Sequence, residues 1–124
     1  MLVRLTHIII YCSDMSRSIS FYRDKMGFPV KSEFGNWIEL HSGPTTLVLY
    51  AAKPASANRW QRDNAEASQA RPAFEVLDLD QFYEEKKANG VEFTMPPTMQ
   101  KFGQRMAVLL DPDGMPISVT EERR

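Results

Sequence analysis

Residues 2–27 read LVRLTHIIIYCSDMSRSISFYRDKMG, a run rich in β-branched residues followed by an amphipathic segment. The first part, up to Tyr11, predicts a strand, and Asp14 is a typical helix N-cap residue. Beyond Asp14, apolar residues recur at helical spacing until Gly27, and glycine at such a position ends many helices in the left-handed conformation. This stretch therefore predicts one strand followed by one helix.

Three more strands are expected after this helix, because short apolar runs alternate with turn residues. Pro29 cannot continue the helix, and the Gly35-Asn36 pair is typical of a two-residue hairpin turn. The predicted strands are Pro29–Phe34, Trp37–His41 and Thr45–Ala51. Together with the first strand and helix, they predict a βαβββ unit.

The segment 52–70 differs in character, since Ala, Ser, Asn, Gln and Arg dominate it and Trp60 is its one large apolar residue. We expect it to be a connector. Trp60 needs burial somewhere, either over the mouth of a ligand site or at a dimer contact.

The same order of elements restarts after this connector. A strand is predicted over residues 71–77, Asp78 is the next N-cap, and the helix that follows ends at Gly90. The separation along the chain between the two N-cap aspartates nearly equals that between the two helix-ending glycines. Such constant offsets indicate a duplication. Further strands are expected at 91–94, 102–110 and 116–121.

These observations predict one domain made of two modules, with module one at 1–51, the connector at 52–70 and module two at 71–124. A chain of 124 residues is long enough to form its own core. The single cysteine excludes an intramolecular disulfide, and two histidines with one cysteine cannot form a structural zinc cluster.

The charge balance and the length of the apolar runs indicate which partners and which location to expect. The chain has 15 basic and 16 acidic residues, so it has no general attraction for phosphate backbones, and nucleic acid is not expected as a partner. The apolar runs fall short of the roughly 20 residues that a membrane span needs. No signal-peptide pattern opens the sequence, so a cytoplasmic location is expected.

A tandem pair of βαβββ units resembles the vicinal oxygen chelate superfamily, which includes glyoxalase I, extradiol dioxygenases, fosfomycin-resistance enzymes and bleomycin-resistance proteins. The most specific points of resemblance are His7, Phe21-Tyr22, Phe74-Glu75-Val76 and Asp111-Pro112-Asp113-Gly114. The resemblance implies an α+β fold in which the two modules form a curved, cup-like mixed sheet with helices on its convex side. It also implies a small molecule in the cup and a homodimer.

Enzymes of this superfamily hold a divalent metal on the cup floor. The resemblance places the corresponding positions at His7, Val48, Arg71 and Ser118. Valine has no donor atom, serine is a poor neutral ligand, and arginine is a permanent cation. Three of the four positions are therefore unsuited to a divalent ion, and we expect no metal and no other cofactor.

Strand alternation predicts which other side chains line the cup. It is applied from the four family positions. For the strand Trp37–His41 hydrophobicity decides, with Ile38 and Leu40 packed on the helices and Trp37, Glu39 and His41 turned into the cup. The sequence offset between Val48 and Ser118, applied to this strand, turns Arg105, Ala107 and Leu109 inward. Ile9 and Tyr11 join the apolar wall. The predicted ligand-binding residues are His7, Trp37, Glu39, Val48, Tyr50, Arg71, Glu75, Arg105 and Ser118.

Several of these residues have two interpretations. His7 either contacts the ligand or exchanges a proton with it, or it is a structural residue satisfied by Ser118, Glu39 or water. Arg71 either pairs with Glu75 or binds a carboxylate or phosphate of the ligand. Arg105 lies either in the site or at its rim.

The function predicted from these residues is metal-independent binding of a small amphipathic or aromatic molecule. The alternative is a glyoxalase-like lyase or a dioxygenase. It would use an atypical metal set, such as His7 with Glu39 or Glu75, or metal-free acid–base chemistry. The sequence assigns no catalytic residue.

Overall fold

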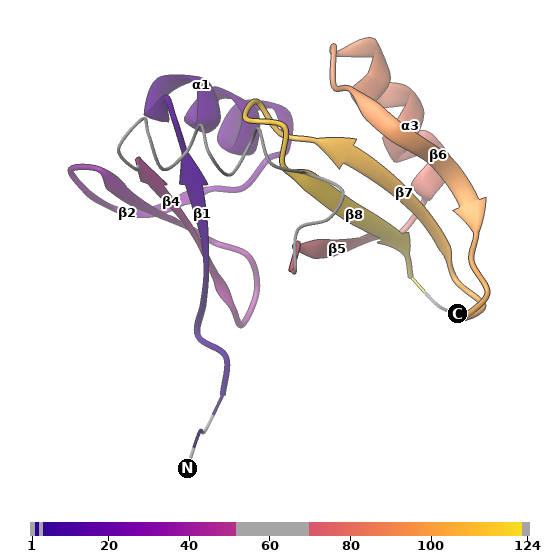
Figure 1. Ribbon diagram of the computed structural model, residues 1–124, viewed down its shortest axis with the longest axis horizontal. Coiled ribbons are helices and arrows are strands. Elements are labelled where there is room, and N and C mark those ends of the chain that lie inside the picture. Colours follow the sequence, from indigo (N-terminus) through magenta and orange to yellow (C-terminus); the bar gives the residue numbers. More distant parts are fainter. Residues whose placement is uncertain (1, 3, 52–69, 123–124) are drawn as a thin grey trace. The chain divides into compact units, whose positions relative to one another are not determined.

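The computed structural model describes residues 2, 4–51 and 70–122 and divides into two compact units (Figure 1). The first unit contains the strands before residue 52, and the second contains those after residue 69. Each described unit holds a four-stranded mixed sheet with a helix packed on it, so the predicted α+β fold with tandem modules is confirmed. The connector prediction, including Trp60, lies outside the described residues.

The first sheet has the strand order β1-β4-β3-β2. Its outer strand β1 runs parallel to β4, and the remaining pairs are antiparallel. The first strand was predicted from residue 2, but it begins where its partner β4 begins, since a strand needs a neighbour for its backbone groups. The elements of this unit are β1 (His7–Cys12), α1 (Met15–Ile19), β2 (Val30–Phe34), β3 (Trp37–Leu40) and β4 (Thr46–Ala51).

The helix α1 begins as predicted, because the Asp14 side chain accepts a hydrogen bond from the Arg17 backbone N–H at 3.1 Å. It then widens into a π-helical turn, Ser20–Lys25, where one uninterrupted helix was expected. The buried rings of Phe21 and Tyr22 meet edge to face at 4.9 Å in this turn. The segment ends at Gly27, whose φ of 89° is the left-handed conformation that glycine favours.

The core of the first unit lies on the sheet face beneath α1. Ile10, Leu49 and Ile38 are paired across three neighbouring strands, and all three are buried. Because side chains alternate along a strand, the residues between them form the opposite face of the sheet. That opposite face carries the candidate site described below.

The second sheet has the strand order β5-β8-β7-β6, which repeats the topology of the first. The helix α3 packs on it beside β6, β7 and β8 (Figure 1). The edge strand β6 is longer than predicted and includes Pro96 and Pro97, which an edge tolerates because one side makes no ladder bonds. The elements are β5 (Ala73–Val76), α3 (Leu79–Ala88), β6 (Phe93–Met99), β7 (Arg105–Leu110) and β8 (Pro116–Glu121).

The register of β7 contradicts one prediction. A constant offset between the modules was expected to place Ala107 and Leu109 on the same face as Ser118. In the structure Ser118 pairs with Val108, whereas Ala107 pairs with Val119. Ala107 and Leu109 are fully buried on the α3 face, so their prediction as cup-lining residues is wrong.

The cause is a hairpin that is one residue longer in the second unit. Val48 in β4 and Ser118 in β8 are the equivalent positions of the repeat, and their partners on the neighbouring strands are Glu39 and Val108. The chain from Val108 to Ser118 is one residue longer than the chain from Glu39 to Val48. A shift of one residue turns every side chain of a strand to the other face. The sequence offset between the modules therefore relates equivalent positions of β4 and β8. For β3 and β7 the equivalent positions differ from this offset by one residue.

The N-cap of α3 provides a first prediction. The Asp78 side chain accepts a hydrogen bond from the Gln81 backbone N–H at 3.0 Å. We expect Asp78→Ala to lower the free energy of unfolding by about 1 kcal/mol in urea denaturation followed by circular dichroism. Asp78→Asn is the control, since it keeps a capping oxygen and should lose only a few tenths of that amount. Equal losses in the two variants would contradict the capping role.

No helix among the described residues combines the length and the apolar character needed to cross a membrane.

Candidate functional site

The open face of the first sheet is the face turned away from Ile10 and the rest of the core. Cross-strand pairing arranges its side chains in rows across neighbouring strands. Five of the nine predicted site residues lie on it: His7, Trp37, Glu39, Val48 and Tyr50. Its other members are Ile9, Tyr11, Ser32, Phe34 and Thr46.

Glu39 is the centre of the polar contacts on the open face. Its Oε1 accepts a hydrogen bond from the Ser32 hydroxyl at 2.7 Å, and its Oε2 accepts one from the Trp37 indole N–H at 3.1 Å. These two bonds, the Ser32 bond first, hold the pKa of Glu39 below its ordinary value, and the nearby His7 and Lys31 act in the same direction. The carboxylate is therefore ionised at neutral pH.

His7 lies beside this carboxylate. Its Nε2 is 3.6 Å from Glu39 Oε2, and its Nδ1 is 2.8 Å from the Thr6 hydroxyl. The ring also lies 6.5 Å from the Trp37 ring, and the side chain remains 39% exposed. Glu39 was one of the predicted partners of His7, whereas Thr6 was not predicted. An oriented and accessible imidazole can both contact a ligand and exchange a proton with it.

The aromatic row is the set of Tyr11, Tyr50, Trp37 and Phe34, one residue from each strand of the sheet. Tyr11 and Tyr50 meet at 5.6 Å with an angle of 72° between their planes, and Tyr50 and Trp37 meet at 6.0 Å with 62°. These edge-to-face contacts fix the orientation of the rings relative to one another. Tyr11 is still 56% exposed, so the row offers aromatic surface to a ligand.

Ser32 and Lys31 were missed in the sequence, as were Thr6 and Phe34. Ser32 holds Glu39, and the Lys31 ammonium donates a hydrogen bond to the Thr46 hydroxyl at 3.2 Å. The Gly35-Asn36 turn could have predicted the position of Ser32. A two-residue turn pairs Phe34 with Trp37, and the same register pairs Ser32 with Glu39. Lys31 had no such signal, since it lies at an irregularity between β2 and β3.

The Ser32–Glu39 hydrogen bond gives a second prediction. The pKa of Glu39 is lower in the folded protein, so the ionised group stabilises the fold above its unfolded pKa, and this contribution is lost as the pH falls through the folded pKa. Ser32→Ala should raise the folded pKa toward the ordinary value, as measured by carbon NMR of the Glu39 carboxyl. The variant should be less stable than the parent at neutral pH and nearly equal to it in acid. Ser20→Ala, at an exposed position, is the control, and an unchanged pKa in Ser32→Ala would contradict the assignment.

The remaining predicted residues lie in the second unit. Ser118 is buried in β8, and Glu75 is exposed on the neighbouring strand β5. Arg71 is exposed just before β5. Within the described residues Arg71 and Glu75 form no ion pair with each other, so the structural interpretation of that pair is not supported.

Arg105 contradicts its prediction as a cup residue, because it lies on the α3 face of its sheet. Its guanidinium donates two hydrogen bonds to the Asp80 carboxylate, at 2.8 and 3.0 Å, and lies 3.7 Å from Glu121. The hydrogen-bonded Asp80 raises the pKa of Arg105, and Arg105 lowers that of Asp80. The longer hairpin explains this position, since with a hairpin of equal length Arg105 would lie on the other face.

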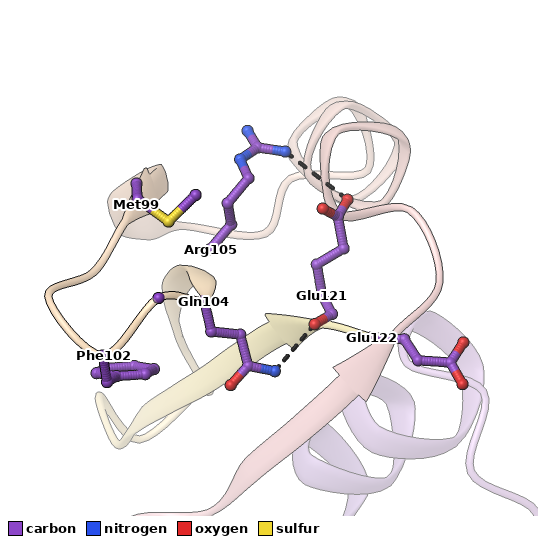
Figure 2. A pocket seen from close by; sticks show the side chains of 7 residues that line it. Met99, Phe102, Gln104, Arg105, Glu121 and Glu122 are labelled. Atoms are coloured by element: carbon purple, nitrogen blue, oxygen red, sulfur yellow. Dashed lines mark hydrogen bonds and ion pairs between the residues drawn. The ribbon is translucent and has the colours of Figure 1, made fainter. Parts of the chain in front are cut away.

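Arg105 lines a hollow of about 390 Å³ in the second unit (Figure 2). Figure 2 shows its side chain directed toward Glu121, while Gln104 donates a hydrogen bond to the Glu121 backbone carbonyl at 2.9 Å. Glu121 also caps α3 by accepting from the Leu79 backbone N–H at 3.0 Å. The polar groups at this hollow therefore hold α3 on its sheet.

The four family positions provide few ligand atoms for a divalent metal. Val48 is buried without a donor atom, Ser118 offers only a neutral hydroxyl, and Arg71 is an exposed cation. In the described part of the chain, no three His, Cys, Asp or Glu residues are grouped so as to hold a metal. Glu39, the acid beside His7, already accepts bonds at both oxygens. The donor set at these positions does not fit the metal of the superfamily's enzymes.

Comparison with known proteins gives consistent matches. The model of the Glyoxalase/Bleomycin resistance protein/Dioxygenase superfamily matches residues 4–119. YwkD of Bacillus subtilis, an uncharacterized protein, is 30% identical over 128 residues, which cover 98% of this chain and 99% of YwkD. A crystal structure of a protein of unknown function from Agrobacterium tumefaciens shares 28% identity with a TM-score of 0.77, over 99% of this chain and 97% of that one. The bleomycin resistance determinant encoded on transposon Tn5 shares the fold, at 23% identity and a TM-score of 0.73, over 98% and 100%.

Proposed function

The chain belongs to the Glyoxalase/Bleomycin resistance protein/Dioxygenase superfamily, and from that premise we propose that it binds a small amphipathic or aromatic molecule without a metal. The open face of the first sheet is the proposed site. The observation that carries the proposal is the combination, on one face, of the aromatic row with a single hydrogen-bonded carboxylate at Glu39. Small-ligand sites are built in this way, with apolar surface for affinity and a few fixed polar groups for orientation.

The metal-independent part of the proposal rests on the chemistry of the donors. His7 is the one strong ligand among the four family positions, and a metal-dependent site needs three or more. In our proposal His7 contacts the ligand directly, with its ring held between Thr6 and Glu39. The residues Arg71, Glu75 and Ser118 remain proposed contributors from the second unit.

A second candidate is an enzyme, either a glyoxalase-like lyase or a dioxygenase, that uses acid–base chemistry at His7. The 3.6 Å approach of His7 to Glu39 favours it, because a neighbouring carboxylate can orient an imidazole ring for proton transfer with a bound molecule. Assays with methylglyoxal and glutathione in the presence of a chelator would detect the lyase activity. Turnover that His7→Ala abolishes would establish the lyase, and absence of turnover would exclude it.

A homodimer is part of the same proposal, because the superfamily resemblance implies one. Several large apolar side chains are exposed in both units, among them Leu5, Phe34, Leu77 and Phe102. Light scattering coupled to gel filtration measures the mass in solution. A mass near twice 14.2 kDa would support the dimer, and a mass near 14.2 kDa would refute it.

The binding site is tested by NMR with an isotope-labelled protein and a panel of small aromatic and amphipathic compounds. We expect shifts concentrated on the amides of β1, β3 and β4. Ile9 is 42% exposed near the centre of the open face, so Ile9→Lys should fold and weaken binding at least tenfold. Leu77→Lys, at a 66% exposed position in the second unit, is the matched control and should bind normally. Binding that survives Ile9→Lys would place the site elsewhere.

A further inference from the structure

The aromatic row and Glu39 define a chemical class of ligand more narrowly than the proposed function does. We propose that the open face binds an organic cation, with an ammonium group held over Trp37 and Tyr50 beside the Glu39 carboxylate. This inference rests on the proposed function, because it uses the same face and names the charge of its ligand.

The first support is the geometry of the rings. Tyr11, Tyr50 and Trp37 follow one another at 5.6 and 6.0 Å, with steep angles between successive planes. Rings at such angles are not stacked face to face, so the face of one ring is not covered by the face of its neighbour. The face of an aromatic ring is its electron-rich side, so neighbouring faces attract a cation placed within about 6 Å of their centres.

The second support is the position of the negative charge. Trp37 donates its indole N–H to Glu39, which fixes the carboxylate at the edge of the indole at 3.1 Å. A cation over the indole therefore lies close to the carboxylate as well. Glu39 stays ionised, because the Ser32 and Trp37 hydrogen bonds lower its pKa, and its side chain is only 18% exposed. Partial burial reduces the screening of this charge by water.

The third support is the position of the positive charge on the same face. The Lys31 ammonium is held at Thr46, and His7 lies in the same cross-strand row as Thr46. Glu39 forms a row with Ile9 and Val48, and this row lies between the row of His7 and Thr46 and the aromatic row. A cationic ligand is thus repelled from the Lys31 end and directed to the aromatic end.

The test compares three compounds that share one aromatic ring and differ in charge: benzyltrimethylammonium, benzyl alcohol and benzoate. Their dissociation constants are measured by NMR titration of the labelled full-length chain. We expect benzyltrimethylammonium to bind at least about tenfold more tightly than benzyl alcohol, and benzoate to bind most weakly. Nuclear Overhauser effects from the trimethyl protons to the Trp37 and Tyr50 rings should locate the ammonium group without any variant.

A matched pair of variants separates the effect of the Glu39 carboxylate on cation binding from the effect of the net charge of the chain. Glu39→Gln should bring the ratio of the benzyl alcohol and benzyltrimethylammonium dissociation constants close to one. Glu33→Gln makes the same change of charge on the neighbouring strand, but Glu33 pairs with Ile38 and so belongs to the opposite face. This control should keep the full preference.

The outcomes distinguish the ligand class from the site. If benzyl alcohol or benzoate binds as tightly as the cation at β1, β3 and β4, the cation proposal is wrong and the proposed function stands. If none of the three compounds binds, the cation proposal is also wrong, and the wider panel decides the proposed function. A preference that Glu33→Gln reduces as much as Glu39→Gln would overturn the role of Glu39.

Discussion

Leu109→Asp is expected to unfold the second unit. Leu109 is fully buried on the α3 face of β7, and an aspartate there would have no partner for its charge. Lost packing and an unpaired buried carboxylate together should cost more than about 4 kcal/mol, a large part of the stability of an ordinary domain. Urea denaturation followed by circular dichroism measures this loss.

Leu110→Asp is the matched control, because Leu110 lies on the other face of the same strand and is only half-buried. It should cost less than half as much. A constant offset between the two modules predicts the reverse order, with Leu110 beneath α3. If Leu109→Asp does not accumulate as soluble protein, the milder pair Leu109→Ala and Leu110→Ala should show the same order, with about 2–5 kcal/mol for the first.

Trp37→Ala is expected to have the largest effect on ligand binding. It removes the central ring of the aromatic row and the indole donor to Glu39 together. Binding of any compound that shifts β1, β3 and β4 should weaken at least about tenfold, since a well-packed aromatic contact contributes on the order of 1–3 kcal/mol. NMR titration measures the change, and the amide spectrum shows whether the variant is folded.

Trp37→Phe separates the two contributions of this side chain. The phenyl ring keeps much of the stacking surface, so binding of aromatic compounds should remain within a few-fold of the parent. Without the indole donor, the pKa of Glu39 should rise, although the Ser32 bond still holds it below the ordinary value. Unchanged binding in Trp37→Ala would remove the aromatic row from the site.

The sequence predicts the fold well because its signals are local. Both N-cap aspartates and the glycines that end the helical segments lie where they were expected. Alternation along β1 likewise turns His7, Ile9 and Tyr11 to one face and buries Ile10 on the other. These features depend on neighbours within a few residues of the same segment, so a single chain reveals them.

The site is predicted less completely because it depends on register between strands. The first hairpin has a two-residue turn, which pairs Phe34 with Trp37 and Ser32 with Glu39. Hydrophobicity along β3 alone placed Trp37 and Glu39 correctly on the open face. The last hairpin is one residue longer than its counterpart, and the symmetry argument therefore failed for Arg105. A repeat transfers a residue's position reliably only where the intervening turn has the same length.

The central claim, metal-independent binding on the open face, is tested most directly by measuring one ligand's affinity with and without a chelator. The tightest-binding compound of the panel is titrated by NMR in EDTA and, after the EDTA has been removed, with one equivalent of diamagnetic Zn²⁺ or Mg²⁺. The account predicts the same dissociation constant in all three samples and shifts on β1, β3 and β4. Loss of binding in EDTA, restored by one equivalent of a divalent ion in the parent but not in His7→Ala, would contradict it.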